Sequence, residues 1–202
     1  MIAIIDYGRG NLYSVEKAFH TLGAQAVITR DAERIRRADK VVLPGVGAFG
    51  DCMANLQNFG LVDVIHEVIH QGKPFLGICL GLQLLFDGSE EDPGVAGLGV
   101  IPGTVKKIAA PGLKIPHMGW NSLKFCTGSP LFADLPGEPY VYFVHSYHAV
   151  PVDSRVITAV TDYGGPVTAA VSMNHVQAVQ FHPEKSSALG MKMLANFKEI
   201  RL

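Results

Sequence analysis

Two spacings of apolar residues alternate along the first half of the chain. Short runs rich in β-branched residues predict strands that are buried on both faces, at residues 2–6, 24–30, 40–45 and 74–78. Between these runs, apolar residues three and four positions apart predict helices, over residues 12–22, 32–38 and 48–71. Asp31 is expected to cap the second of these helices. Strands that alternate with helices indicate an α/β fold with a doubly wound, mostly parallel sheet and flanking helices.

The second half of the chain has a different pattern, in which short apolar runs are separated by turn residues. These runs predict additional β-rich segments, at residues 99–109, 121–125, 140–150, 156–162, 167–174 and 176–181. A helical spacing returns over residues 187–200. With 202 residues, 48% of them hydrophobic, the chain can bury one substantial core, and we expect a single domain over residues 1–202.

Charge and cysteine content narrow the classes of function. The 17 Lys and Arg residues nearly balance the 18 Asp and Glu residues and are scattered, which argues against nucleic acid and membrane surfaces as partners. The longest apolar stretch, residues 73–86, falls short of the ~20 residues that a membrane span needs. Cys52, Cys79 and Cys126 show no clustered spacing, which argues against a disulfide framework and a structural zinc site. A cytoplasmic location is therefore expected.

Cys79 stands where a predicted strand gives way to a predicted helix. It lies between Gly77 and Gly81 in the pattern Gly-x-Cys-x-Gly, the form of a nucleophile elbow in which larger side chains at both glycine positions would collide. A cysteine at the start of a helix is also favoured as the thiolate by the helix dipole. This pattern predicts a nucleophilic cysteine, although a small buried cysteine between glycines would look the same.

A base for this cysteine is predicted at the end of the last β-rich run. Pro183 biases His182 toward an extended backbone, so the strand should stop and present the imidazole at its carboxyl end. Open parallel sheets have their sites at that edge. Glu184 is close enough to accept a hydrogen bond from one ring nitrogen, which leaves the other nitrogen to take a proton from Cys79.

Six segments together resemble the class-I glutamine amidotransferases, and within that family the glutaminase subunits of imidazole glycerol phosphate synthases. The segments are DYGRGNL, LPGVGAFGD, GICLGLQLL, IPHMGWN, YFVHSYHA and QFHPEKSS. The resemblance implies a flavodoxin-like fold and hydrolysis of glutamine to glutamate and ammonia without a cofactor. It implies Cys79 as nucleophile, His182 as base and then acid, and Glu184 as the group that orients His182.

The resemblance also implies contacts with glutamine and with a partner. Glutamine contacts are expected from Gly47, Gln83, Glu91, Ser146 and Tyr147, although Glu90 could serve in place of Glu91. The implied partner is a cyclase subunit with a (β/α)8 barrel, which would use the ammonia to make imidazole glycerol phosphate and an aminoimidazole carboxamide ribonucleotide in histidine biosynthesis. Residues expected to face it are Asn11, Trp120, Tyr142 and Lys185.

Two backbone amides are expected to form the oxyanion hole. Leu80 would supply one from the elbow, and Val46 would supply the second from the neighbouring Pro44-Gly45-Val46-Gly47 loop. Because a β-branched residue resists positive φ angles, we hypothesise that this peptide rests with its N–H turned away and flips when the partner binds its ligand.

Other functions have to be weighed against this one. His66 and His70 match the H-E-x-x-H pattern of zinc peptidases, but the apolar spacing on their helix favours a solvated face. The alternatives are a glutaminase subunit for another acceptor, as in pyridoxal phosphate or aminobenzoate synthesis, a stand-alone cysteine hydrolase or thiol sensor, and an inactive partner-binding protein. Cys52 and Cys126 are interpreted as small packing residues.

Overall fold

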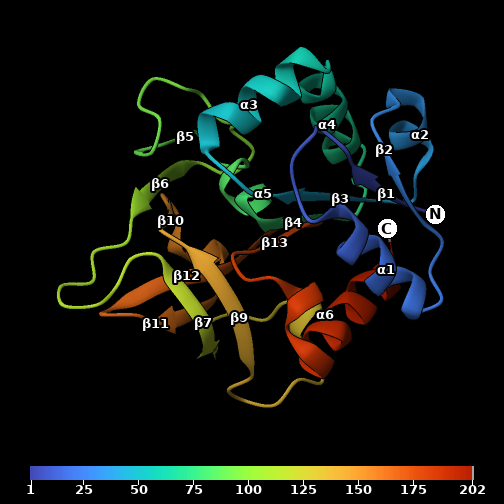
Figure 1. The fold of residues 1–202 in the computed structure, drawn as a ribbon. Helices are drawn as coiled ribbons and strands as arrows, with labels where there is room; N and C mark the ends of the chain where they lie inside the picture. The colour runs from blue at the N-terminus through green and yellow to red at the C-terminus, as the bar shows by residue number, and fades with distance from the viewer. Residues whose placement is uncertain (202) are drawn as a thin grey trace.

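The computed structural model describes residues 1–201 and contains a large mixed sheet (Figure 1). Its strands are β1 (Ile2–Ile5), β2 (Ala26–Thr29), β3 (Lys40–Gly45), β4 (Phe75–Cys79), β8 (Lys124–Phe125), β11 (Ile157–Asp162), β12 (Pro166–Met173) and β13 (Val176–Val179). They lie in the order β2-β1-β3-β4-β13-β12-β11-β8. The strands from β2 to β13 run parallel, and β12, β11 and β8 continue the sheet in antiparallel fashion. The mostly parallel sheet is thus confirmed.

Six α-helices belong to the described residues, and they agree with the sequence pattern except in two places. They are α1 (Leu12–Thr21), α2 (Ala32–Arg37), α3 (Phe49–Asn58), α4 (Leu61–His70), α5 (Leu80–Gln83) and α6 (Ser187–Glu199). The helical region predicted over 48–71 is present but divided, because Gly60 takes a left-handed conformation with φ of 65° and separates α3 from α4. The helix expected after Cys79 is only four residues long, so its dipole contributes little at the cysteine.

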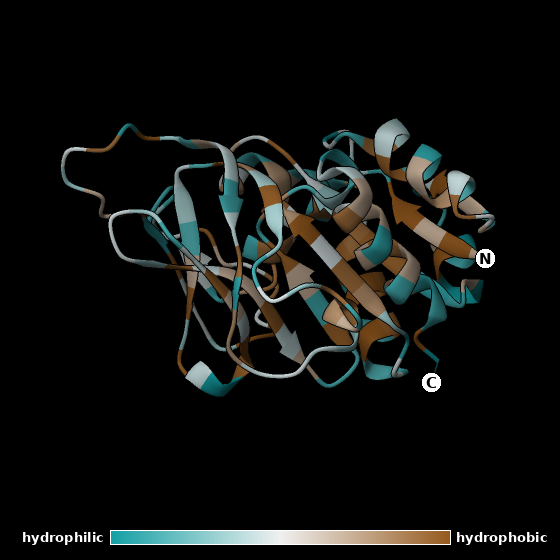
Figure 2. Ribbon diagram, turned by 90° about the horizontal axis from the view of Figure 1, so that it is seen from below, coloured by the Kyte–Doolittle hydropathy of each residue, from teal (hydrophilic) through white to brown (hydrophobic). Residues whose placement is uncertain are grey.

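Helices cover both faces of the parallel part of the sheet because its strands bury alternate side chains on opposite sides. Ala3, Ile5 and Leu43 pack with α2, α3 and α4, whereas Ile4 and Val42 pack with α1 and α6. Figure 2 shows the result as strands that are hydrophobic over most of their length, beneath helices that carry hydrophilic residues on their outer sides. Strands buried on both faces explain why the first four predicted runs are continuously apolar.

Two small sheets stand beside the large one on the side of β12 and β11 (Figure 1). The first consists of β5 (Gly88–Ser89), β6 (Gly103–Lys107) and β10 (Tyr147–Pro151), and the second of β7 (His117–Ser122) and β9 (Tyr140–His145). The run predicted as one β-rich segment over 140–150 therefore contributes to two sheets. The bend between them places Ser146 and Tyr147 beside the carboxyl ends of the central strands.

Three neighbouring strands end at the same edge of the large sheet. Gly45 at the end of β3 pairs in register with Cys79 at the end of β4. On the other side of β4, β13 runs parallel to it and leads directly to His182. Among residues 1–201, no helix has both the length and the apolar content needed to cross a bilayer.

Candidate active site

The elbow around Cys79 has the strained geometry that the two glycines predict. Cys79 has a φ of 56°, in the region that residues with a side chain rarely occupy. A Cβ atom on Gly81 would lie 1.8 Å from the Leu43 carbonyl oxygen, and one on Gly77 would lie 2.8 Å from the Gly81 carbonyl oxygen. Glycine is therefore required at both positions, and the turn holds the sulfur at the edge of the sheet.

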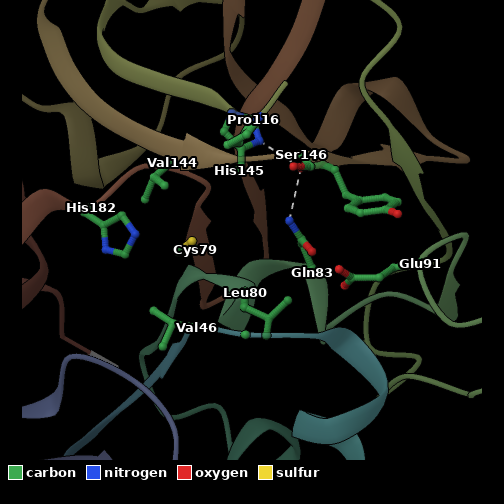
Figure 3. A pocket seen from close by; sticks show the side chains of 12 residues that line it. Val46, Cys79, Leu80, Gln83, Glu91, Pro116, Val144, His145, Ser146 and His182 are labelled. Atoms are coloured by element: carbon green, nitrogen blue, oxygen red, sulfur yellow. Dashed lines mark hydrogen bonds between the residues drawn. The ribbon is translucent and has the colours of Figure 1, made fainter. Parts of the chain in front are cut away.

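His182 and Glu184 form a buried pair next to the cysteine. Nδ1 of His182 lies 2.9 Å from Oε1 of Glu184, and the two side chains are only 2% and 1% exposed. Figure 3 shows a ring nitrogen of His182 directed toward Cys79, and Nε2 forms no hydrogen bond with other residues of the described chain. Burial opposes protonation of His182, but its interactions with Cys79 and Glu184 prevail and raise its pKa to about 10. This arrangement favours an imidazolium beside the sulfur.

A cavity of about 410 Å³ opens above Cys79, within the size range of small-molecule sites (Figure 3). The residues that line it come from six parts of the chain, and they are Val46, Gly47, Cys79, Leu80, Gln83, Glu91, Pro116, Val144, His145, Ser146, Tyr147 and His182. All five residues predicted to contact glutamine are thus brought to one cavity. Their roles as contacts remain predictions.

The structure separates the two candidate glutamates. Glu91 lines the cavity and accepts a hydrogen bond of 2.9 Å from the backbone N–H of Phe49, the first residue of α3. Glu90 instead accepts a hydrogen bond from the backbone N–H of Lys107 on β6 and does not line the cavity. The geometry therefore favours Glu91 as a partner for a cationic group in the cavity.

The loop after β3 borders the cavity on the side of α5. Val46 is 39% exposed, and its carbonyl oxygen lies 3.6 Å from Sγ of Cys52, which donates to it. Gly47 has a φ of 109°, which suits glycine alone. Leu80, which follows Cys79, is buried against the same loop. The oxyanion roles of Val46 and Leu80, and the flip of the peptide, stay predictions.

Three of the four residues expected to face a partner lie near one another. Trp120 on β7 and Tyr142 on β9 are paired in register, with ring centroids 6.2 Å apart, and Trp120 is 51% exposed. Lys185 is exposed in the short 3-10 turn Pro183–Lys185, which is joined to β9 by a hydrogen bond from the His182 N–H to the Tyr142 carbonyl. Asn11 precedes α1, which also contacts this turn.

Several buried polar residues around the site were not singled out from the sequence. His145 lines the cavity, and its Nδ1 lies 2.8 Å from the Tyr147 carbonyl oxygen. His117 and Gln180 lie behind it, 3% and 0% exposed. An alternating polar residue in a strand predicts a solvent-facing side chain as readily as a buried one, so the sequence pattern contains no signal that separates these three from surface residues.

Of the remaining expectations, the solvated helix face at His66 and His70 and the packing role of Cys52 agree with the structure, whereas the packing role expected of Cys126 is wrong because Cys126 is exposed. Helix α4 buries Leu61, Val64, Ile65 and Val68, while His66 is partly exposed and His70 is exposed. No group of three His, Cys, Asp or Glu residues within positions 1–201 is placed to hold a metal ion. Cys52 is buried, and burial raises its pKa to about 11, so its thiol stays protonated. Cys126 is exposed and distant in the chain from the site.

Comparison with known proteins establishes the family. The family model described as "Glutamine amidotransferase class-I" matches residues 3–200. The imidazole glycerol phosphate synthase subunit HisH of Moorella thermoacetica is 53% identical over 199 residues, which make up 98% of this chain and 94% of that protein. The chain belongs to the class-I glutamine amidotransferases, within their HisH group. It is therefore an enzyme, and a glutaminase subunit by family.

Other relatives of this amidotransferase agree. The protein of the same name from Methanothermobacter thermautotrophicus is 53% identical over 200 residues, covering 99% of this chain and 98% of that protein. Among solved structures, one titled "Crystal structure of glutamine amidotransferase" has a TM-score of 0.77 at 18% identity and covers 98% of both chains. PurLQS from Thermotoga maritima has a TM-score of 0.76 at 19% identity, covering 98% of this chain and 96% of that one. These structures establish the fold of the amidotransferase.

Proposed function

We propose that this enzyme hydrolyses glutamine through Cys79, His182 and Glu184. The thiolate of Cys79 attacks the carboxamide carbon of glutamine, and protonated His182 gives its proton to the leaving nitrogen as the carbon–nitrogen bond breaks. Ammonia departs, and a glutamyl thioester remains on Cys79. His182 then takes a proton from a water molecule that attacks the thioester, and glutamate and the thiolate are released. The raised pKa of His182, which favours the imidazolium, supports its role as the acid.

We propose that the cavity residues fix the substrate for this attack. Glutamine carries an ammonium and a carboxylate, so its site needs an acidic side chain and several donors. Glu91 is the candidate for the ammonium, while Ser146, Tyr147 and Gly47 are candidates for the remaining contacts because all line the cavity. The amides of Leu80 and Val46 would stabilise the developing oxyanion.

We propose that the ammonia passes to a cyclase subunit with a (β/α)8 barrel, in the synthesis of imidazole glycerol phosphate for histidine. The names of the relatives support this acceptor, and they weigh against pyridoxal phosphate or aminobenzoate synthesis. The outward faces of β7 and β9 carry exposed apolar side chains beside Lys185, namely those of Met118, Trp120 and Tyr140. A surface of this kind suits a protein partner. We also propose that residues 1–202 form one domain and that the protein is located in the cytoplasm.

One observation carries the proposal, namely that a strained elbow and a buried His–Glu pair meet at one cavity. The test is Cys79→Ala in the assembled synthase. Glutamine-dependent synthesis should be lost, while synthesis from added ammonium salt continues, because only the supply of ammonia is removed. His182→Ala should behave similarly, and Glu184→Ala more mildly.

The matched control is Cys126→Ala, since Cys126 is an exposed cysteine outside the site. It should keep both activities. Glutamate release that persists in Cys79→Ala would exclude Cys79 as the nucleophile, and loss of ammonium-dependent synthesis in that variant would point to a damaged complex.

A further inference from the structure

Gln180 lies directly behind Cys79 and bonds to the nucleophile. It follows β13 and is completely buried, and its Nε2 lies 3.7 Å from Sγ of Cys79. Its Oε1 lies 2.9 Å from Nε2 of Gln83, a residue that lines the cavity. Gln180 itself does not line the cavity, so it acts on Cys79 and Gln83 from the side of these residues that faces away from the cavity.

A backbone carbonyl fixes the direction of these hydrogen bonds. The Tyr147 carbonyl oxygen can only accept, so the Gln83 amide must present its NH2 group to it, at 3.1 Å. The second N–H of that group donates to Gln180, so Oε1 of Gln180 must be the acceptor. The NH2 group of Gln180 is thereby turned to the sulfur, where an N–H stabilises the thiolate more than the thiol.

Two neutral histidines continue this series of hydrogen bonds beyond the Tyr147 carbonyl. His145 donates from Nδ1 to the same Tyr147 carbonyl, a bond drawn in Figure 3. Its Nε2 lies 2.9 Å from Nδ1 of His117, so one ring must donate to the other and both are satisfied without a charge. Burial lowers the pKa of His145 to about 3 and that of His117 to about 4. Both rings are therefore neutral at neutral pH, and the donors and acceptors in this series of hydrogen bonds stay the same.

The same arrangement leaves one polar atom for the substrate. Both N–H groups of Gln83 are used within the protein, so its Oε1 is the remaining hydrogen-bonding atom. In Figure 3 this oxygen points away from the Tyr147 carbonyl, toward the side of the cavity that Glu91 lines. An acceptor beside a carboxylate suits a donor-rich group such as an ammonium.

We propose that Gln180 is a positioning residue of the glutaminase reaction, which donates an N–H to Sγ of Cys79 and holds the Gln83 amide with its oxygen toward the substrate. This inference rests on the proposed function for its kinetic part. The contact between Gln180 and Cys79 can be tested without glutamine, because alkylation of the thiol by iodoacetamide reports how readily the thiolate forms.

The test is Gln180→Glu, which keeps an acceptor for Gln83 but replaces the N–H at the sulfur by an oxygen. His182 and Tyr7, the titratable side chains whose pKa values respond to Cys79, are unchanged in this variant. Alkylation of Cys79 at neutral pH should slow about tenfold, the lower end of what a hydrogen bond to a charged group is worth. The pH at which the alkylation rate rises should also be higher in the variant than in the parent. In the assembled synthase, kcat for glutamine hydrolysis should fall similarly while KM changes little.

The matched control is Gln177→Glu, because Gln177 lies on β13, is 2% exposed, and its side chain bonds only to the Ser129 and Ser172 side chains among the described residues. It should leave the alkylation profile unchanged. Gln180→Met, which is uncharged and similar in length, serves if the glutamate variant fails to fold, as thermal unfolding would reveal. It should slow alkylation and also raise KM, because Gln83 loses its acceptor.

Parent-like alkylation in folded Gln180→Glu or Gln180→Met would overturn the proposal, and so would equal slowing in Gln177→Glu. If the parent synthase released no glutamate from glutamine, the proposed function would fail. The alkylation profiles would still decide whether Gln180 acts on Cys79.

Discussion

Replacing Gly81 by alanine should displace Cys79, the proposed nucleophile, without changing its side chain. A Cβ atom there would lie 1.8 Å from the Leu43 carbonyl oxygen, whereas such contacts are essentially never shorter than 3.0 Å, so the backbone must move by at least the difference of 1.2 Å. Leu43 is paired with Gly77 between β3 and β4, so the movement separates the elbow from the strand beside it. No flexible side chain can absorb it, because the obstructing atom is backbone.

The magnitude follows from the size of this overlap. Overpacking a well-packed interior costs about 1–3 kcal/mol, and a backbone clash belongs at the upper end, about 3 kcal/mol. For a chain of this size that lowers the melting temperature by about 6–12 °C. A misplacement of about 1 Å at the reacting atoms costs on the order of 10²-fold in turnover. Gly81→Ala should therefore lose both stability and glutamine hydrolysis.

Thermal unfolding and glutamate release in the presence of the proposed cyclase subunit are the two assays. Gly128→Ala is the control, because no atom lies within 4 Å of a Cβ at Gly128 and its φ is not positive. It should match the parent or be slightly more stable. If Gly81→Ala had the same melting temperature as Gly128→Ala and hydrolysed glutamine at the parent rate, the elbow would not depend on the close approach to β3.

Further results are expected for four residues. Val46→Gly should raise the basal rate of glutamine hydrolysis and reduce its stimulation by the partner's ligand, and Val46→Pro should suppress stimulated hydrolysis; unchanged rates in both would rule out gating by this peptide. Lys185→Ala should weaken assembly with the cyclase subunit or its coupling to hydrolysis while the fold stays intact, and an unchanged titration would remove Lys185 from the interface. Because burial lowers the pKa of His145 to about 3, unfolded chains bind more protons below about pH 6.5, and the free energy of unfolding should fall with falling pH by up to about 1.4 kcal/mol per unit. Urea unfolding of His145→Gln should show a shallower acid slope, and an equal slope would contradict the assignment. The pKa of His182 is raised instead, so its contribution is complete below about pH 6.5 and is lost as the pH rises through about 10.

The sequence predicted the helical and parallel part of the fold well because each element there is local. The strand runs and the Asp31 cap agree with the structure, in which the Asp31 side chain accepts from the Arg34 N–H. The break at Gly60 was missed because a glycine within apolar helical spacing does not reveal that it adopts a left-handed conformation.

The β-rich half was harder, because strand pairing there joins distant residues. Residues 140–150 form one apolar run, yet β9 pairs with β7 and β10 with β6. Periodicity identifies a strand but not its neighbour. The same limit applies to Gln180, whose partners Gln83 and Cys79 belong to a segment far away in the sequence.

The pairing of β4 with β13 also means that the proposed active site cannot form until late in the synthesis of the chain. While residues 80–175 are being made, on the order of 5–20 seconds at ~5–20 residues per second, the edge of β4 has no β13 to pair with. The backbone N–H and C=O groups along that edge are then unpaired. Because His182 follows β13, the proposed base for Cys79 is present only when nearly all of the chain has been synthesised. Under the proposed mechanism, a prematurely terminated chain would keep the cysteine but could not release ammonia.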